Sequence, residues 1–276
     1  MTIKQVGEKT GLAPGTIRMW EHRYGFPDPA RSESGYRHYG DDDVARIRSV
    51  IAYRDRGLTI PAAIERVLAS DEPAEASIYA AVATAEGAPK AQVLRKSTLH
   101  ALSRAMEHEA LAQGAKPICF GAFQHEGFYR PVEHRYRQIA RSADATVVFA
   151  DFDEVRNSGQ RRPVEIPIAP EDALGNEWVV IVDSPGYSAC LLAWEQAGDS
   201  RGGTRDQDRR FEALWTVDPK IVRRASEVAT RLAARRDPDL GEKLDGLLAA
   251  RPIGGEDSSA VLTALTNRIV AYVEAS

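Results

Sequence analysis

Apolar residues recur at helical spacing close to the amino terminus and predict two short helices. The first, over residues 3–9, begins with Thr2 and Gln5 in the arrangement of a capping box and ends at Gly11. The second begins at Pro14, whose fixed φ suits a first helical turn. Its apolar face consists of Ile17, Trp20 and Tyr24. Two short helices joined by a glycine turn predict a helix-turn-helix, whose second helix reads DNA.

A short ribbon is expected next. Pro27 and Pro29 lack amide donors, so the second helix cannot continue through them. The run Gly35-Tyr-Arg-His-Tyr39 then predicts a wing, in which Tyr36 and Tyr39 pack at the base or bind a phosphate. The unit ends near residue 70 after two more helices, whose predicted buried residues are Val44, Ile47, Ile51, Ile64, Val67 and Leu68.

Three runs in this segment carry a resemblance to a known family. They are Thr16-Ile-Arg18, Trp20-Glu-His-Arg-Tyr-Gly25 and Gly35-Tyr-Arg-His-Tyr39. The first 70 residues resemble the winged-helix domain of the MerR family of transcription regulators, in the subgroup with a Trp-Glu-Arg-Arg-Tyr-Gly run. The resemblance implies a homodimer on a near-palindromic operator in double-stranded promoter DNA. Such dimers distort the duplex, which makes RNA polymerase an indirect partner.

The side chains expected to contact DNA lie on the second helix and on the wing. The resemblance makes Arg18 and Arg23 contacts of the reading helix and Arg37 a phosphate contact of the wing. For His22 and His38, an ordinary solvated surface position fits the sequence as well as a DNA contact does. His22 also stands where the subgroup usually has arginine, so the base preference cannot be copied. The candidate set is Thr16, Arg18, His22, Arg23, Arg31, Tyr36, Arg37 and His38.

The composition changes after residue 70. Residues 70–76 are acidic and include a proline, which predicts a hinge. The expected segments are a DNA-binding domain over 1–72, a hinge with a short helix over 73–89, an α/β domain over 90–217 and helices over 218–276. A long amphipathic helix is expected from Lys90 to near Gly114. Strand-like and helical runs then alternate, which predicts four to six strands, and the polar stretch 195–210 predicts a mobile loop.

The middle region has a resemblance of its own. Its four runs are Leu99-His-Ala-Leu-Ser-Arg-Ala-Met-Glu-His-Glu109, Gly121-Ala-Phe-Gln-His-Glu-Gly-Phe-Tyr-Arg130, Val147-Val-Phe-Ala-Asp-Phe152 and Phe211-Glu-Ala-Leu-Trp215. They are similar to the DICT sensory domain, a module found beside diguanylate cyclases, two-component proteins and MerR-type domains. The resemblance implies a sensor role and leaves the ligand open. The predicted fold class is an all-α winged helix-turn-helix followed by a larger mixed α/β sensor domain with C-terminal helices.

Polar and aromatic side chains gather after a predicted strand end, where open α/β sheets usually bind ligands. The candidate ligand-binding residues are Gln124, Glu126, Tyr129, Arg130 and Asp151. The alternative is that these residues tie the sheet to its helices through hydrogen bonds. Asp183 also closes a strand, and the tryptophans at 178, 194 and 215 are expected in the core.

The last helix carries an apolar stripe that fits a seam with a partner helix. Its residues are Leu262, Leu265, Ile269, Tyr272 and Val273. We expect the first helix of the sensor domain, the C-terminal helices, or both to form the dimer interface.

Composition limits the remaining classes. The net charge of −4 is unlike that of a general polyanion binder, and residues 1–40 form only a local basic patch. The sequence shows neither an apolar run that could span a bilayer nor a leader, so a cytoplasmic protein without a membrane partner is expected. Cys119 and Cys190 have apolar neighbours, which predicts buried thiols and no metal site. The sequence identifies no cofactor, so the cofactor is unknown.

The leading hypothesis is a one-component transcription regulator, in which an unknown small-molecule or protein signal acts through the α/β domain. The alternative is a DNA-binding regulator whose second domain is a dimerisation or protein-interaction platform without a small ligand. An enzyme is least favoured, because no His-Glu-x-x-His motif, nucleophile elbow or phosphate-cradling loop is present. We therefore expect no catalytic residues and no metal ligands.

Overall fold

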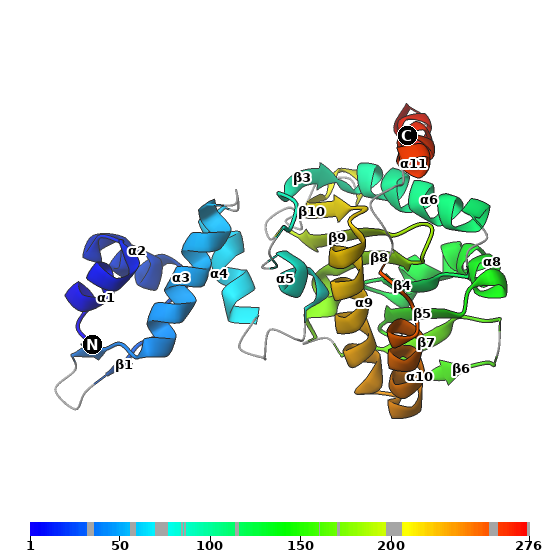
Figure 1. Ribbon diagram of the computed structural model, residues 1–276. Helices are drawn as coiled ribbons and strands as arrows, with labels where there is room; N and C mark the ends of the chain where they lie inside the picture. Colours follow the sequence, from blue (N-terminus) through cyan, green and yellow to red (C-terminus); the bar gives the residue numbers. More distant parts are fainter. Residues whose placement is uncertain are drawn as a thin grey trace. The chain divides into compact units, whose positions relative to one another are not determined.

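The structure is a computed structural model with two compact units, residues 1–71 and 72–276 (Figure 1). The predicted fold class is confirmed, since a helical unit precedes a larger unit of sheet and helices that ends in helices. Each unit has a hydrophobic core of its own. The structure describes residues 1–31, 36–55, 59–69, 77–83, 85, 87–113, 116–159, 161–169, 172–196, 206–253 and 259–274.

The smaller unit is helical apart from a two-stranded ribbon. Its elements are α1 (Ile3–Thr10), α2 (Pro14–Tyr24), β1 (Ala30–Arg31), β2 (Arg37–His38), α3 (Asp41–Asp55) and α4 (Ile60–Ala69). Thr2 and Gln5 form the predicted capping box, and Gly11 ends α1 with a left-handed φ of 75°. Pro14 opens α2, also as predicted.

The core of this unit lies between the helices and the base of the ribbon. Its largest fully buried side chains include Trp20, Phe26 and Tyr39. A Cβ on Gly7 would lie 2.7 Å from the carbonyl oxygen of Leu12, so glycine lets the turn pass close to α1. The prediction that Leu68 is buried is wrong: it is 41% exposed. Val67 is buried as predicted, and Ala63 is buried with it on the face of α4 that packs on α3.

The larger unit is built on one sheet. Within the described residues it has eight strands in the order β3-β10-β9-β8-β4-β5-β7-β6. They are β3 (Gln92–Arg95), β4 (Ile118–Ala122), β5 (Ala145–Ala150), β6 (Arg156–Asn157), β7 (Val164–Pro167), β8 (Glu177–Asp183), β9 (Ala189–Glu195) and β10 (Arg210–Thr216). β5 pairs in parallel with β4 and β7, and the other neighbours are antiparallel.

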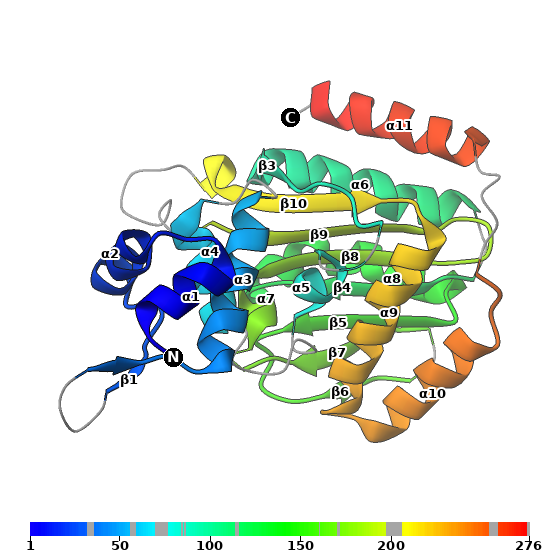
Figure 2. The ribbon, with the colours of Figure 1, turned by 60° about the vertical axis from the view of Figure 1, so that its left-hand side comes forward.

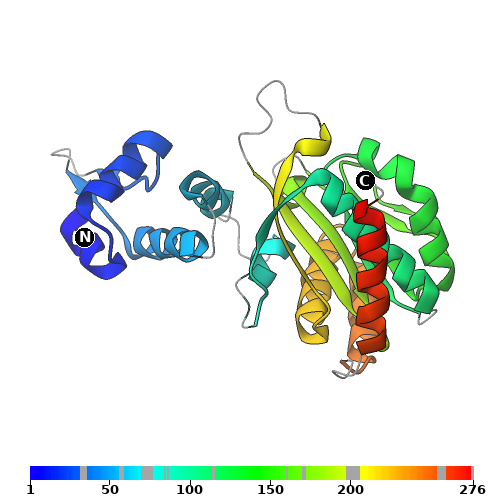
Figure 3. The ribbon, with the colours of Figure 1, turned by 90° about the horizontal axis from the view of Figure 1, so that it is seen from above.

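Helices cover both faces of this sheet (Figure 2). They are α5 (Ile78–Ala83), α6 (Lys96–Gln113), α7 (Glu126–Tyr129), α8 (Glu133–Ser142), α9 (Pro219–Ala234), α10 (Pro238–Ala249) and α11 (Ser259–Glu274). α5 and α9 lie on one face with α10 beside α9, and α6 and α8 lie on the other. α11 packs on α6 (Figure 3). None of the helices in the described ranges is long and apolar enough to cross a membrane.

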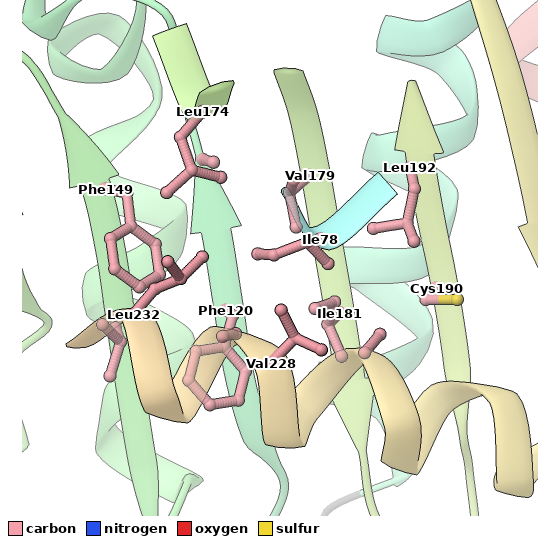
Figure 4. Packing of buried hydrophobic residues seen from close by; sticks show 14 of the residues in the cluster. Ile78, Phe120, Phe149, Leu174, Val179, Ile181, Cys190, Leu192, Val228 and Leu232 are labelled. Carbon is pink, nitrogen blue, oxygen red and sulfur yellow. The ribbon is translucent and has the colours of Figure 1, made fainter. Parts of the chain in front are cut away.

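The sheet separates two buried layers. Phe120 and Ile181 pack in the layer under α9 (Figure 4). Cys190 belongs to the same layer, whereas Cys119 packs in the layer under α6. Both thiols are buried, as predicted, and burial raises the pKa of Cys190 to about 12. The two cysteines lie on opposite faces, with β8 between their strands, so they cannot pair with each other.

The helix predicted to start at Lys90 starts later, at Lys96. The residues before it form β3, which pairs with β10 so that Leu94 lies opposite Phe211. This pairing gives β10 a second neighbour and supplies a strand that the sequence pattern did not predict. The two-residue β6 at the other edge was also missed, because it is too short to show alternation.

Two other regions differ from the prediction. The helical run between β4 and β5 is divided, because a 3₁₀ turn at Arg130–Val132 separates α7 from α8 and Pro131 has no amide to donate. Most of the loop expected over 195–210 lies outside the described residues, and Asp206–Asp208 forms a 3₁₀ turn. The short helix expected before the α/β domain is α5, and its side chains are part of the core of the larger unit.

Candidate nucleic-acid interface and ligand cavity

The polar residues predicted to read DNA lie along α2. The side chains of Arg18, His22 and Arg23 are exposed, and Thr16 is half-buried. Trp20 is 1% exposed and belongs to the core, as predicted. α2 therefore presents a row of hydrogen-bond donors away from the core, which is what a helix in a major groove requires.

The predicted wing is the antiparallel ribbon of β1 and β2, in which Arg31 lies opposite Arg37. Arg37 and His38 are exposed. The two wing tyrosines have different positions: Tyr36 is 77% exposed, whereas Tyr39 is 1% exposed in the core. Only Tyr36 is thus placed at the surface of the wing. The side chain of Arg31 lies outside the described part of the structure.

An ion pair holds the wing against the reading helix. Nε of Arg37 donates to both carboxylate oxygens of Glu21 on α2, at 2.7 and 2.8 Å. The Glu21 carboxylate accordingly raises the pKa of Arg37. Among the described residues, only Nε of Arg37 has a recorded partner, so its two terminal nitrogens remain for a phosphate. Glu21 could not be predicted from the sequence, because an acidic residue on a basic helix gives no sign of a partner 16 positions away.

The larger unit contains a cavity of about 210 Å³ beyond the end of β4, between α6 and the α7 to α8 segment. Its aromatic lining consists of Phe123, Phe128, Tyr136 and Trp178. The indole Nε1 of Trp178 donates to Ser103 at 2.9 Å, and the Trp178 ring meets His100 edge-on at 4.8 Å between centroids. These contacts fix one wall of the cavity.

Two cations line the same cavity. Lys96 donates to both carboxylate oxygens of Asp206 at 2.7 and 2.8 Å, and its Nζ lies 4.2 Å from the ring centroid of Phe128. Arg135 donates from Nε to Glu107 at 2.7 Å. Although His100 remains exposed, its pKa is lowered by desolvation and by the positive charges of Lys96 and Arg135. The field at this imidazole is therefore net positive.

Three segments of the chain match known domain families. Residues 1–70 match the MerR HTH family of regulatory proteins. Residues 75–196 match DICT, the sensory domain in diguanylate cyclases and two-component systems. The chain carries a MerR-type domain followed by a DICT domain. Residues 205–276 match the C-terminal domain of a two-partite extracellular sensor domain.

Known transcription regulators are similar to part of the chain. The HTH-type transcriptional repressor CarA of Myxococcus xanthus is 39% identical over 69 residues, which are 24% of this chain and 24% of CarA. The repressor CarH of the same organism is 34% identical over 99 residues, which are 36% of this chain and 33% of CarH. The regulator AdhR of Bacillus subtilis is 37% identical over 65 residues, 24% of this chain and 46% of AdhR. The chain thus spans only about a quarter to a half of these relatives.

Of the five residues predicted to bind a ligand in the DICT domain, Gln124 lines the cavity. Its amide is held at both ends: Nε2 donates to Glu195 at 2.6 Å, and Oε1 accepts from Arg209 at 2.9 Å. Gln124 therefore joins the rim of the cavity to β9 and to the segment before β10.

Glu126 and Arg130 lie in a separate hollow that is lined mainly by charged side chains. Arg130 donates to both carboxylate oxygens of Glu165 at 2.6 and 2.8 Å and to Glu126 at 2.7 Å. The hydrogen bonds to Glu165 are the largest contribution that raises the pKa of Arg130. Asp151 accepts from the backbone N–H of Glu126 and lies 3.0 Å from Nδ1 of His125. These contacts attach α7 to the sheet.

Tyr129 is fully buried in an aromatic cluster with Phe123, Tyr136 and Phe152. In the described structure, Glu126, Arg130 and Asp151 make hydrogen bonds of the kind that the alternative interpretation expected. Tyr129 packs through its ring, and its hydroxyl has no hydrogen-bond partner among the described residues. Lys96, His100 and Arg135 could not be predicted as cavity residues, because residues on two separate helices show no common pattern in the sequence. Across the described ranges, no group of three or more His, Cys, Asp or Glu is placed to hold a metal ion.

Proposed function

We propose that this chain is a one-component transcription regulator that binds a near-palindromic promoter operator as a homodimer. In this proposal the DICT domain binds a signal in its cavity and thereby changes how the MerR-type domain binds DNA. RNA polymerase is affected indirectly, through the bound promoter. The observation that carries the proposal is the pairing, in one chain, of an exposed reading helix and wing with a separate domain that contains a cavity.

A dimer is supported by the charge of the DNA-binding unit. Residues 1–40 contain six basic and four acidic side chains, which is a small patch for a duplex. Two copies double the number of phosphate contacts, and the affinity for DNA rises with that number. A signal can then act only if it binds more tightly to one of two arrangements of the paired DNA-binding units.

The Arg37→Gln variant tests the wing. Once genomic footprinting has given a site, the affinity of the full chain for that duplex is measured at several salt concentrations. Arg37→Gln is expected to weaken binding to specific and unrelated duplexes alike, and to reduce the slope of log K against log salt by about one unit. The reason is that its terminal nitrogens contact a phosphate, which carries no sequence information.

Two further variants sharpen this test. Arg54→Gln removes an exposed arginine at the far end of α3 and should leave the slope unchanged. Glu21→Gln frees Arg37 from its ion pair, so it should keep the slope while altering affinity. An unchanged slope for Arg37→Gln would remove the wing from the interface. A monomeric protein that binds none of the tested duplexes would contradict the proposed function itself.

A further inference from the structure

We propose that the DICT cavity binds a small planar aromatic carboxylate, with Arg135 holding the anionic group. This inference rests on the proposed sensory function and specifies the chemical class of its signal. It is drawn from the size of the cavity, from the rings that line it and from the charges that face it.

The cavity suits a small, flat ligand. Its volume of about 210 Å³ is below the range of roughly 300–1,000 Å³ that is usual for pockets of drug-sized molecules. Aromatic rings surround it, and such rings favour the faces and edges of another aromatic ring. The Trp178 indole N–H is already bonded to Ser103, so this wall requires no hydrogen-bond acceptor from the ligand.

Arg135 supplies the site for the carboxylate. Its side chain is 19% exposed and lines the cavity, and Nε is bonded to the buried Glu107. Within the described part of the chain, no hydrogen bond is recorded from its two terminal nitrogens. The Glu107 contact fixes the guanidinium plane and leaves two parallel N–H groups, which match the two oxygens of a carboxylate.

The carboxylates in the described lining of the cavity already have partners. Glu107 accepts from Arg135, Asp206 accepts from Lys96, and Glu177 accepts from Ser77 and from the backbone N–H of Tyr79. Lys96 also lies over the face of Phe128, so a bound cation could not stack on that ring. The charges of Lys96 and Arg135 also oppose a proton on His100, in spite of the opposite effect of Asp206. The side chain of Lys96 is only 5% exposed, whereas that of its partner Asp206 is 61% exposed. A ligand carboxylate that displaced Asp206 would keep the buried ammonium paired and return the Asp206 carboxylate to water.

The test is isothermal titration of the full chain with matched probes. Benzoate, phenylacetate and indole-3-carboxylate carry both the ring and the charge. Benzamide keeps the ring without the charge, and cyclohexanecarboxylate keeps the charge without the flat ring. We expect at least one aromatic carboxylate to bind. Its amide should bind at least about tenfold more weakly, as should its saturated analogue, because each lacks one of the two recognised features.

Arg135→Gln should weaken binding of that carboxylate by at least about tenfold and leave binding of the amide unchanged. Arg141→Gln is the matched control, since Arg141 is exposed near the end of the same helix and does not line the cavity. Arg135→Lys keeps the charge but not the two parallel N–H groups, so its affinity for the carboxylate should lie between that of the unaltered chain and that of Arg135→Gln. Melting temperatures establish that each variant is folded.

Several results would overturn the ligand class. They are equal affinity for benzoate and benzamide, no effect of Arg135→Gln, or no binding of any aromatic carboxylate up to millimolar concentration. The proposed sensory function fails separately: a carboxylate that binds through Arg135 and leaves DNA affinity unchanged supports the ligand class and contradicts signal control. Conversely, a neutral fraction of a cell extract that changes the affinity of the unaltered chain for DNA, but not that of a variant in a cavity residue, would support the sensory function. That result would contradict the carboxylate as the ligand class.

Discussion

Replacing Arg223 by methionine is expected to lower the free energy of unfolding of the larger unit by about 3–5 kcal/mol. Arg223 on α9 donates from Nε and from a terminal nitrogen to the two carboxylate oxygens of Asp183, at 2.7 and 3.1 Å. The two side chains are only 10% and 4% exposed. Methionine preserves much of the packing but leaves the Asp183 carboxylate buried without its counter-charge, which accounts for the size of the effect.

The same guanidinium also holds the end of α10. Its other terminal nitrogen donates to the carbonyl oxygens of Leu248 and Arg251, at 3.1 and 3.2 Å. Urea unfolding followed by circular dichroism measures the loss. Arg224→Met is the control, since the next residue of α9 is exposed, and it should change stability by less than about 0.5 kcal/mol.

Adding Asp183→Asn to Arg223→Met should recover part of the stability, because a neutral amide is less costly to bury than an unpaired carboxylate. If Arg223→Met costs no more than Arg224→Met, the buried pair contributes little to the fold.

The second large effect is expected at Gly241, where α10 crosses α9. A Cβ at this position would lie 2.3 Å from the Cβ of Ala234 and 2.9 Å from its Cα. These atoms belong to the chain of α9 and cannot rotate away, so Gly241→Ala must push the two helices apart. We expect a loss of about 1–3 kcal/mol in the free energy of unfolding, as is typical of overpacked interiors.

Gly246 on the same helix provides the matched control. Among the described residues, no atom outside the neighbouring backbone of α10 lies within 4 Å of the place where its Cβ would be. Gly246→Ala should therefore stabilise the unit, by up to about 1 kcal/mol, because alanine is the better helix former. Thermal unfolding of both variants tests the pair, and equal melting temperatures would mean that the close approach of α9 and α10 does not require glycine.

Elements with local signals could be predicted from the sequence. The ends of α1 and the start of α2 follow from Thr2, Gly11 and Pro14, whose effects act within a few residues. β3 could not be predicted in this way, because its apolar residues fit a helix or a strand equally well. These residues form a strand because they pair with β10, which lies far away in the sequence.

The candidate ligand site was predicted only at its rim. Gln124 was found because it follows a strand end, which is a local rule. Arg135 was missed because it occurs in a polar helix, where an arginine is normally solvated. Its position beside Glu107 depends on how α8 packs against α6, and this packing is a property of the fold.

The two sides of α6 have different neighbours. His100, Ser103 and Glu107 line the cavity, whereas His108 and Glu109 contact Tyr272 and Arg268 of α11. An alanine scan along this helix would consequently return two classes of phenotype that alternate within a single turn. Any assay that reports only overall function would mix them, so such a scan needs separate readouts for ligand affinity and for the docking of the last helix.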